Sequence, residues 1–267
     1  MKFKYLIIAF SIIIVFILLI LALSLLLVAK YESTANLRYI TLSVFLFMAL
    51  ILVCLGIFFL FNYRLFSLLE REDWPALAYY LEQKIYVKGR YSVQNVRILA
   101  GSYMVVSDYP SVLKLESKTM LVKPDIIKKN ALIFGSARVL NGSYKEAAAF
   151  FKTYLGKDEW VRWFYNFSLL LDGAFSQVEP EFLSLARYSG NVLITGLSAF
   201  FLTNNLARHS QNPEECRAVS ESGRSRVVDL LKKEDNWKKE ADKMRTEIHI
   251  AIIRKYIDEV GKWLFAS

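Results

Sequence analysis

Two long segments near the N-terminus contain no charged side chain, and they constrain the fold more than any other feature of the sequence. The first covers residues 5–29 and the second covers residues 40–61. A helix crosses the hydrocarbon core of a bilayer with about 20 apolar residues, so each segment is long enough to span a membrane. A cleaved signal peptide would have a shorter apolar region, followed by a small-residue cleavage site, whereas Lys30 follows the first segment. The sequence therefore predicts a transmembrane hairpin over residues 1–62.

The connection between the two predicted spans, residues 30–39, is short, so both ends of the chain should emerge on one side of the membrane. Basic residues near span ends favour the cytoplasmic side. Four of them flank the hairpin on the outside and two lie in the connection: Lys2, Lys4, Arg64 and Arg71 against Lys30 and Arg38. We expect an integral protein of a bacterial-type inner membrane, with both termini and the soluble domain in the cytoplasm. The spans contain no ionisable residue in their interiors, which indicates an anchor and not a channel or carrier.

Helical periodicity dominates the rest of the chain, without sustained strand-like alternation. We predict an all-α fold with three parts: the hairpin over 1–62, helical repeats over 63–190 and a helical region over 191–267. The expected helices are 62–72, 74–87, 92–106, 110–119, 126–141, 143–156, 158–172, 179–188, 191–208 and a long one near 224–265. Their boundaries follow turn-forming and capping residues, including a break at Glu179–Pro180.

Aromatic residues recur at the predicted helix starts. Trp74, Tyr109 and Tyr144 each follow a short turn, and they are 35 residues apart. A fixed interval of this size, covering two helices, is typical of helical repeat arrays.

The third of these units resembles the tetratricopeptide repeat, whose length is about 34 residues. Its first helix holds Gly135, and its second is entered through Gly142 and holds Tyr144, Ala147 and Phe151. The other units keep the pattern less fully, since Leu65 replaces a small residue in the first, Glu116 replaces a large apolar residue in the second, and the fourth has a shorter interval. The resemblance implies an α-solenoid of helical hairpins that binds a protein partner through the first helix of each unit. The implied partner-binding residues are Gln94, Arg97, Lys129 and Ser136.

The C-terminal region has an apolar stripe at helical spacing, opposite a charged side. The stripe runs from Trp237 through Ile248 and Tyr256 to Trp263. Because the last unit of a solenoid exposes an apolar face unless it is covered, we expect one long helix over 224–265 to cap the stack. A dimerising seam or a segment lying on the membrane are the alternatives.

Signals for chemistry are sparse. His209, His249, Cys54 and Cys216 are the only histidines and cysteines, which is too few for a metal site at recognisable spacing. We expect no metal and no cofactor. Residues 63–267 carry 30 basic and 24 acidic side chains, and the basic clusters are interrupted by acids, so we expect no nucleic acid; anionic lipid headgroups are the closer match.

The favoured hypothesis is a membrane-anchored scaffold or adaptor, without enzymatic activity, that docks a protein partner or helps to assemble a membrane complex. One alternative is an anchored enzyme of helical fold whose pocket has no short sequence motif. Another is a component of an envelope machine that self-associates through 224–265.

Overall fold

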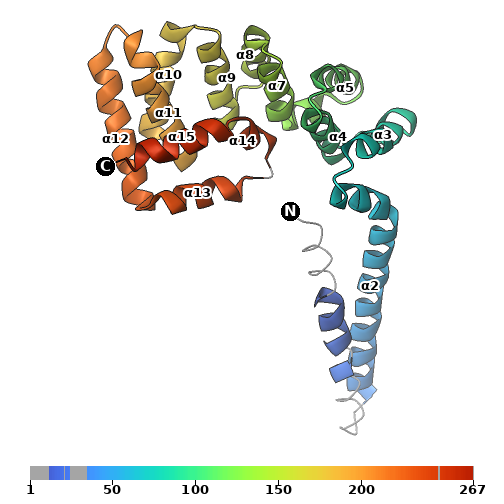
Figure 1. Ribbon diagram of the computed structural model, residues 1–267. Coiled ribbons are helices and arrows are strands. Elements are labelled where there is room, and N and C mark those ends of the chain that lie inside the picture. The colour runs from blue at the N-terminus through green and yellow to red at the C-terminus, as the bar shows by residue number, and fades with distance from the viewer. Residues whose placement is uncertain (1–11, 21, 25–34, 246, 267) are drawn as a thin grey trace. The chain divides into compact units, whose positions relative to one another are not determined.

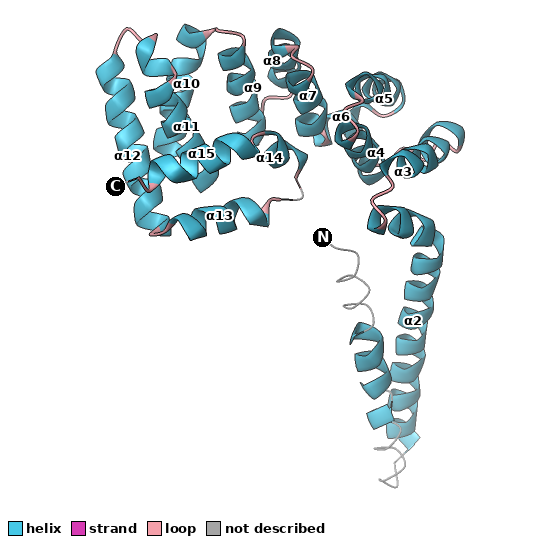
Figure 2. Ribbon diagram, viewed as in Figure 1, coloured by secondary structure: helices cyan, strands magenta, loops and turns pink. Residues whose placement is uncertain are grey.

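The computed structural model describes residues 12–20, 22–24, 35–245 and 247–266. Helices account for 83% of the structure, and these ranges contain no strand (Figure 2). The predicted all-α fold class is therefore confirmed. The chain divides into two compact units, Met1–Tyr80 and Leu81–Ser267.

The first unit contains one long apolar helix, α2, over Ala35–Glu70 (Figure 1). Its portion Leu42–Glu70 is long and apolar enough to cross a membrane, with a mean hydropathy of 3.1 and none of its most apolar window buried. Ser43 and Asn62 donate side-chain hydrogen bonds to carbonyl oxygens four residues earlier, at 2.9 and 2.8 Å. Such bonds satisfy polar groups in an apolar medium. The predicted span 40–61 thus lies inside a longer helix.

An apolar helix also covers Ile12–Ser24, of which residues 12–20 and 22–24 are described. The remainder of the predicted first span lies outside the described residues, as do Lys2, Lys4 and Lys30. The hairpin and its orientation therefore stay predictions.

The same backbone turn precedes four helices. Each turn contains a residue of positive φ, with values of 54°, 59°, 75° and 82° at Glu72, Ser107, Gly142 and Gly173. The next residue donates its N–H to the carbonyl oxygen five residues earlier, at 2.8–3.2 Å, which is the hydrogen bond of a Schellman helix end. A new helix begins one residue later, at Trp74, Tyr109, Tyr144 and Phe175. The intervals of 35, 35 and 31 residues are those of the predicted aromatic register.

Successive helices of the second unit pack against one another. After the end of α3 (Trp74–Glu82) and a π-helical turn at Gln83–Val87, they are α4 (Val93–Val105), α5 (Tyr109–Val122), α6 (Pro124–Lys129), α7 (Ala131–Leu140), α8 (Tyr144–Thr153), α9 (Glu159–Leu171), α10 (Phe175–Tyr188), α11 (Val192–Asn204), a 3-10 turn at Leu206–Arg208, and α12 (Pro213–Leu231). Alternate helices also touch, since α7 contacts α4 and α9, and α11 contacts α9. Helices α10 and α11, which flank the expected boundary at residue 190, pack on each other.

Close packing of α7 on α8 depends on a glycine. A Cβ atom at Gly135 would lie 2.2 Å from the ring of Phe151, whose side chain is fully buried. Ala147, one turn earlier on α8, is also fully buried. Gly135, Ala147 and Phe151 therefore lie in the interior, with Gly135 against Phe151, whereas Gly142 is exposed at the turn.

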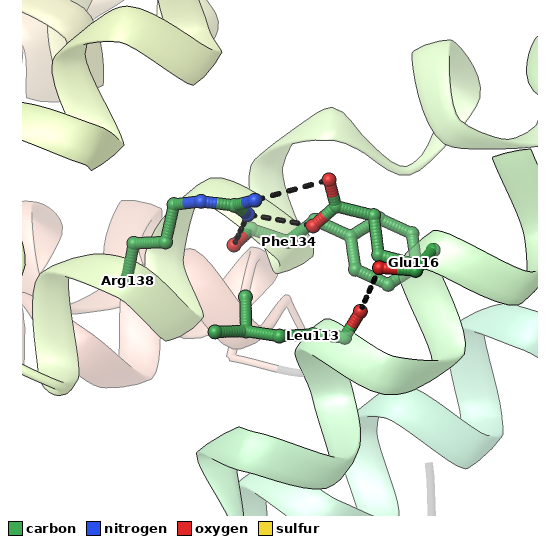
Figure 3. Close-up of polar contacts among 5 residues, drawn as sticks. Leu113, Glu116, Phe134 and Arg138 are labelled. Atoms are coloured by element: carbon green, nitrogen blue, oxygen red, sulfur yellow. Dashed lines mark hydrogen bonds and ion pairs between the residues drawn. The ribbon is translucent and has the colours of Figure 1, made fainter.

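An ion pair joins α5 to α7 where the sequence led us to expect an apolar contact. Arg138 donates two hydrogen bonds to the Glu116 carboxylate, at 2.6 and 3.1 Å, and a third to the Phe134 carbonyl oxygen at 3.1 Å (Figure 3). The guanidinium carbon also lies 4.4 Å from the centre of the Phe150 ring. Glu116 and Arg138 are only 11% and 16% exposed, so the acid that departed from the repeat pattern is used as a buried polar link.

The prediction of one long helix over 224–265 is wrong. Helix α12 begins earlier, at Pro213, and ends where Lys232 adopts a left-handed conformation with a φ of 65°. Three shorter helices follow: α13 (Glu234–Lys243), α14 (Ile248–Ile252) and α15 (Arg254–Leu264). The apolar periodicity continues through these breaks, and no Gly or Pro marks them. The sequence pattern alone therefore could not reveal them.

Two other helix boundaries need correction. The predicted helix 126–141 is interrupted at Asn130, whose side chain donates a hydrogen bond to the Val93 carbonyl oxygen of α4 at 3.2 Å. The predicted break at Glu179–Pro180 is absent, because α10 already begins at Phe175 and includes Pro180. Pro180 is the sixth residue of α10 and lacks the N–H that would bond the carbonyl oxygen of residue 176, yet the helix continues past it.

Candidate partner-binding face

The three C-terminal helices, α13, α14 and α15, pack on two helices of the second unit that are not neighbours in the chain, α7 and α11. Helix α14 contacts α7, and both α13 and α15 contact α11. Trp237 of α13 is 1% exposed and donates its indole N–H to the Ile257 carbonyl oxygen of α15 at 2.9 Å. A Cβ atom at Gly196 of α11 would lie 2.7 Å from the Trp237 ring, so this glycine lets α13 approach α11. The C-terminal segment therefore runs along the stack and does not simply cap its last helix.

Aromatic contacts continue this cover onto α9. The ring of His249 lies 5.0 Å from Trp160, and the ring of Tyr256 lies 5.5 Å from Phe167 and 5.2 Å from Phe201. These separations are typical of interacting rings in a protein core. The face made by α7, α9 and α11 is therefore occupied by the protein's own chain.

Three of the four predicted partner-binding residues lie beside this face, Gln94 and Arg97 on α4 and Lys129 at the end of α6. Gln94, Arg97 and Lys129 are exposed. The Arg97 guanidinium donates to the Asn130 side-chain oxygen at 3.0 Å and to the Lys129 carbonyl oxygen at 3.4 Å. Gln94 is three residues before Arg97 and so lies on the same side of α4. These residues form one polar cluster at the α4 end of the face, which we call the α4 cluster.

Ser136, the fourth predicted residue, does not belong to this cluster. Its side chain is fully buried within α7, and its hydroxyl oxygen has no hydrogen-bond partner among the described residues. Proximity in the repeat pattern placed it on the binding face, but the break at Asn130 changes the face that α7 presents. A partner therefore has no access to Ser136 in this structure.

Sequence comparison assigns the chain to a family. The protein-family model described as "Uncharacterised Treponema protein" matches residues 111–266. The chain belongs to this family. A relative from Treponema pallidum (strain Nichols), described as an uncharacterized protein, is 25% identical over 232 residues, which cover 83% of this chain and 74% of the relative. No solved structure matches the chain. Because the matched range reaches residue 266, the covering helices α13–α15 belong to the part that the family shares.

Asn130 is the functional candidate that sequence reasoning missed. It is 3% exposed, and it accepts from Arg97 while donating to the Val93 carbonyl oxygen. It lies inside the predicted helix 126–141, but its residue type was a signal, because an Asn side chain competes with the hydrogen bonds of a helix backbone. Its role is to fix the Arg97 side chain in the α4 cluster.

The remaining histidine and cysteine have local packing roles. The His209 ring stacks on Phe175 with 4.0 Å between centres. Cys216 is buried, and burial raises the pKa of its thiol. Among the described residues, no three His, Cys, Asp or Glu side chains gather as metal ligands would.

A concavity of about 410 Å³ lies between α11, α12 and α13, and Arg226 is part of its lining. Arg226 donates to the carbonyl oxygens of Ala186 and Arg187 and to the Thr195 hydroxyl. Its guanidinium is therefore engaged in holding the end of α10, as a cation near a helix C-terminus commonly is, and an anionic ligand would have to displace these bonds.

Acidification should weaken the attachment of α14. Burial first, and the positive charge of Arg97 second, lower the pKa of His249 to about 4. In the unfolded chain the pKa is about 6.5, so between these values the unfolded chain binds more protons. Stability is complete above pH 6.5 and falls as the pH decreases toward 4, by about 2 kcal/mol between pH 7.5 and pH 5.

Denaturant unfolding at these two pH values measures this loss. The His249→Phe variant should lose about 2 kcal/mol less than the native chain on acidification. The His209→Gln variant is the matched control and should behave like the native chain. An unchanged pH dependence in His249→Phe would contradict a neutral, buried His249.

Proposed function

We propose that the protein is a membrane-anchored helical-repeat scaffold, similar to tetratricopeptide-repeat proteins, that docks a protein partner through the α4 cluster. The observation that carries this proposal is the α4 cluster itself: an exposed polar group at the α4 end of a helical face, with the Arg97 guanidinium held by hydrogen bonds. The rest of that face is covered by α13–α15, so a partner would find its access at α4.

The anchor is α2. Its segment Leu42–Glu70 has the length and hydropathy of a membrane span, and the apolar segment before it would complete a hairpin. On this proposal both ends of the chain lie in the cytoplasm, as four basic residues outside the hairpin against two in its connection favour.

Repeated helical hairpins suit such a role because they build an extended surface from local packing. The four equivalent turns and the α7–α8 contact at Gly135 support a solenoid of this kind. Three residues of the apolar stripe, Trp237, Ala241 and Val260, are buried within the chain, and the rings of Tyr256 and Trp263 contact Phe201 and Phe200. This favours a distinct partner over self-association through 224–265.

The chemistry of the α4 cluster favours an acidic or carboxylate-bearing segment of the partner. Arg97 and Lys129 supply positive charge, and Asn130 holds the Arg97 guanidinium in place. A preorganised guanidinium binds carboxylates well.

Site-specific photocrosslinking in living cells tests this function. A photoreactive residue in place of Gln94 should give one discrete adduct with another polypeptide, and Arg97→Glu in the same chain should remove it. The same probe at Lys152, which is exposed on α8, is the control and should give no such adduct. Identical adducts from both positions, or adducts made only of this chain, would refute a partner docked at α4.

A further inference from the structure

Two segments of the second unit that are distant in sequence meet at the end of α5. The Nζ atom of Lys118 lies 4.0 Å from the centre of the Tyr86 ring. Lys123 donates a hydrogen bond to the Tyr91 carbonyl oxygen at 3.4 Å. These contacts bring residues 86–91 beside the end of α5. The exposed residues there, which we call the α5-end surface, are Val87, Lys88, Lys118, Leu121, Val122 and Lys123.

Aliphatic side chains on the α5-end surface project into solvent. Leu121 is 88% exposed, Val87 is 72% exposed and Val122 is 53% exposed. A single exposed apolar residue is ordinary on a protein surface. Several of them interleaved with lysines are typical of segments that insert shallowly at a membrane interface.

Positive charge is concentrated in the same stretch of chain. Residues 83–130 contain nine Lys and Arg against three Asp and Glu, a net charge of +6, whereas residues 131–267 contain nineteen against seventeen, a net charge of +2. Two of the three acids are already engaged, since Glu116 pairs with Arg138 and Asp108 caps the opposite end of α5. The third acid, Asp125, is exposed two residues after Lys123, and the cations of this stretch still outnumber the acids by nine to three.

Lys84 shows the effect of this concentration of cations. Its pKa is lowered by burial and then by the positive charge of Arg90. The smaller of the two causes is a like charge, which disfavours protonation of its neighbour.

A short stretch of chain connects α2 to residues of this surface. Helix α2 ends at Glu70. Helix α3 and the π-helical turn that follows it together cover residues 74–87. At about 1.5 Å for each helical residue and about 3.5 Å for each extended one, the connection from Glu70 to Val87 reaches roughly 30 Å. If a bilayer holds α2, its headgroups would therefore stay within reach of this surface, which raises their effective concentration there.

We propose that the α5-end surface rests on the anionic lipid headgroups of the bilayer that holds α2. Its lysines lie at the lipid phosphates, and Leu121, Val87 and Val122 enter the boundary between headgroups and acyl chains. This inference rests on the proposed membrane anchoring by α2 and adds a second point of contact that orients the helical stack. Charge and chain reach favour lipid over an acidic macromolecule as the occupant.

Lipid quenching on the full chain in nanodiscs tests the proposal. A fluorescent label is attached at Ser117→Cys, one turn from Leu121, in a chain carrying Cys54→Ser; Cys216 is buried and stays unlabelled. The discs contain spin-labelled lipid and either phosphatidylcholine alone or a mixture with phosphatidylglycerol. Quenching should be about twofold stronger in the anionic discs, and about 0.5 M salt should remove the difference.

Three controls separate the outcomes. A label at Lys152→Cys on α8 should be quenched equally in both discs, and the Lys118→Glu/Lys123→Glu variant should lose the difference at position 117. A label on the native Cys54 of α2 reports anchoring itself. Quenching at Cys54 without any preference for anionic discs at position 117 would overturn the inference and leave the anchor intact. Absence of quenching at Cys54 would overturn the proposed anchoring, and the inference would fall with it.

Discussion

Replacing Gly135 with alanine should lower the free energy of unfolding by about 1–3 kcal/mol, although alanine is the better helix former. The added methyl group would lie 2.2–2.6 Å from atoms of the Phe151 ring. That ring has little freedom to move, because it is fully buried and lies 5.8 Å from Phe164 and 6.0 Å from Phe150, centre to centre. Urea unfolding in detergent, followed by circular dichroism, measures the change.

Gly101 provides a matched control within a neighbouring helix. A Cβ atom there would meet its nearest neighbour, Cδ1 of Ile133, at 3.9 Å, which is ordinary contact. Gly101→Ala should therefore be neutral or stabilise the protein by up to about 1 kcal/mol. In the Gly135→Ala chain, a further Phe151→Leu substitution should recover part of the loss. Equal effects of alanine at Gly135 and Gly101 would show that α7 and α8 are not in such close contact.

Local signals were sufficient to predict where the helical hairpins turn. A left-handed residue followed two positions later by an aromatic helix start is a short-range pattern, and it occurs at Trp74, Tyr109 and Tyr144. Helix ends of this kind depend on a few neighbouring residues: Gly142 and Gly173 accept a positive φ readily, whereas at Glu72 and Ser107 the signals are the Asp–aromatic–Pro sequences 73–75 and 108–110 that open the next helix. For this reason the hairpin boundaries and the contact at Gly135 could be predicted from the sequence.

The path of the C-terminal segment could not be predicted, because tertiary packing determines it. Lys232 takes a left-handed conformation that lysine rarely adopts, and composition gives no hint of it there. The turn brings Trp237 against Gly196 of α11 and beside Gly261 of α15. An amphipathic period identifies the apolar face of a segment but not the number of helices that the segment makes.

The candidate site was predictable only in part, because tertiary packing also determines which of its residues meet. Gln94 and Arg97 lie near each other because they follow helical spacing on α4, whereas Lys129 is 32 residues from Arg97 and is brought to it by the packing of α6 on α4. Asn130 and Ser136 were misjudged because their surroundings depend on how α6 and α7 meet at a break. The ion pair of Glu116 and Arg138 joins residues 22 positions apart, and no spacing rule pairs them.

Removing one member of this ion pair should have the other large effect on stability. In the Glu116→Leu variant the Arg138 guanidinium keeps only the Phe134 carbonyl oxygen and the Phe150 ring, and it remains 84% removed from solvent if the fold is unchanged. Breaking a buried pair on one side costs about 3–5 kcal/mol. Urea unfolding of Glu116→Leu should show a loss at the lower end of this range, because Arg138 can turn partly toward water.

Removing both members should be far less harmful than removing one. In the Glu116→Leu/Arg138→Met chain no charge is left buried, and apolar side chains of similar size fill the contact between α5 and α7. The double variant should therefore recover most of the loss, with a coupling energy above about 2 kcal/mol. The Arg162–Glu181 pair, whose side chains are 38% and 41% exposed, is the control and should couple by no more than about 1 kcal/mol. If both pairs coupled equally, Glu116 would be a solvated surface acid and not the link that replaces an apolar contact between these helices.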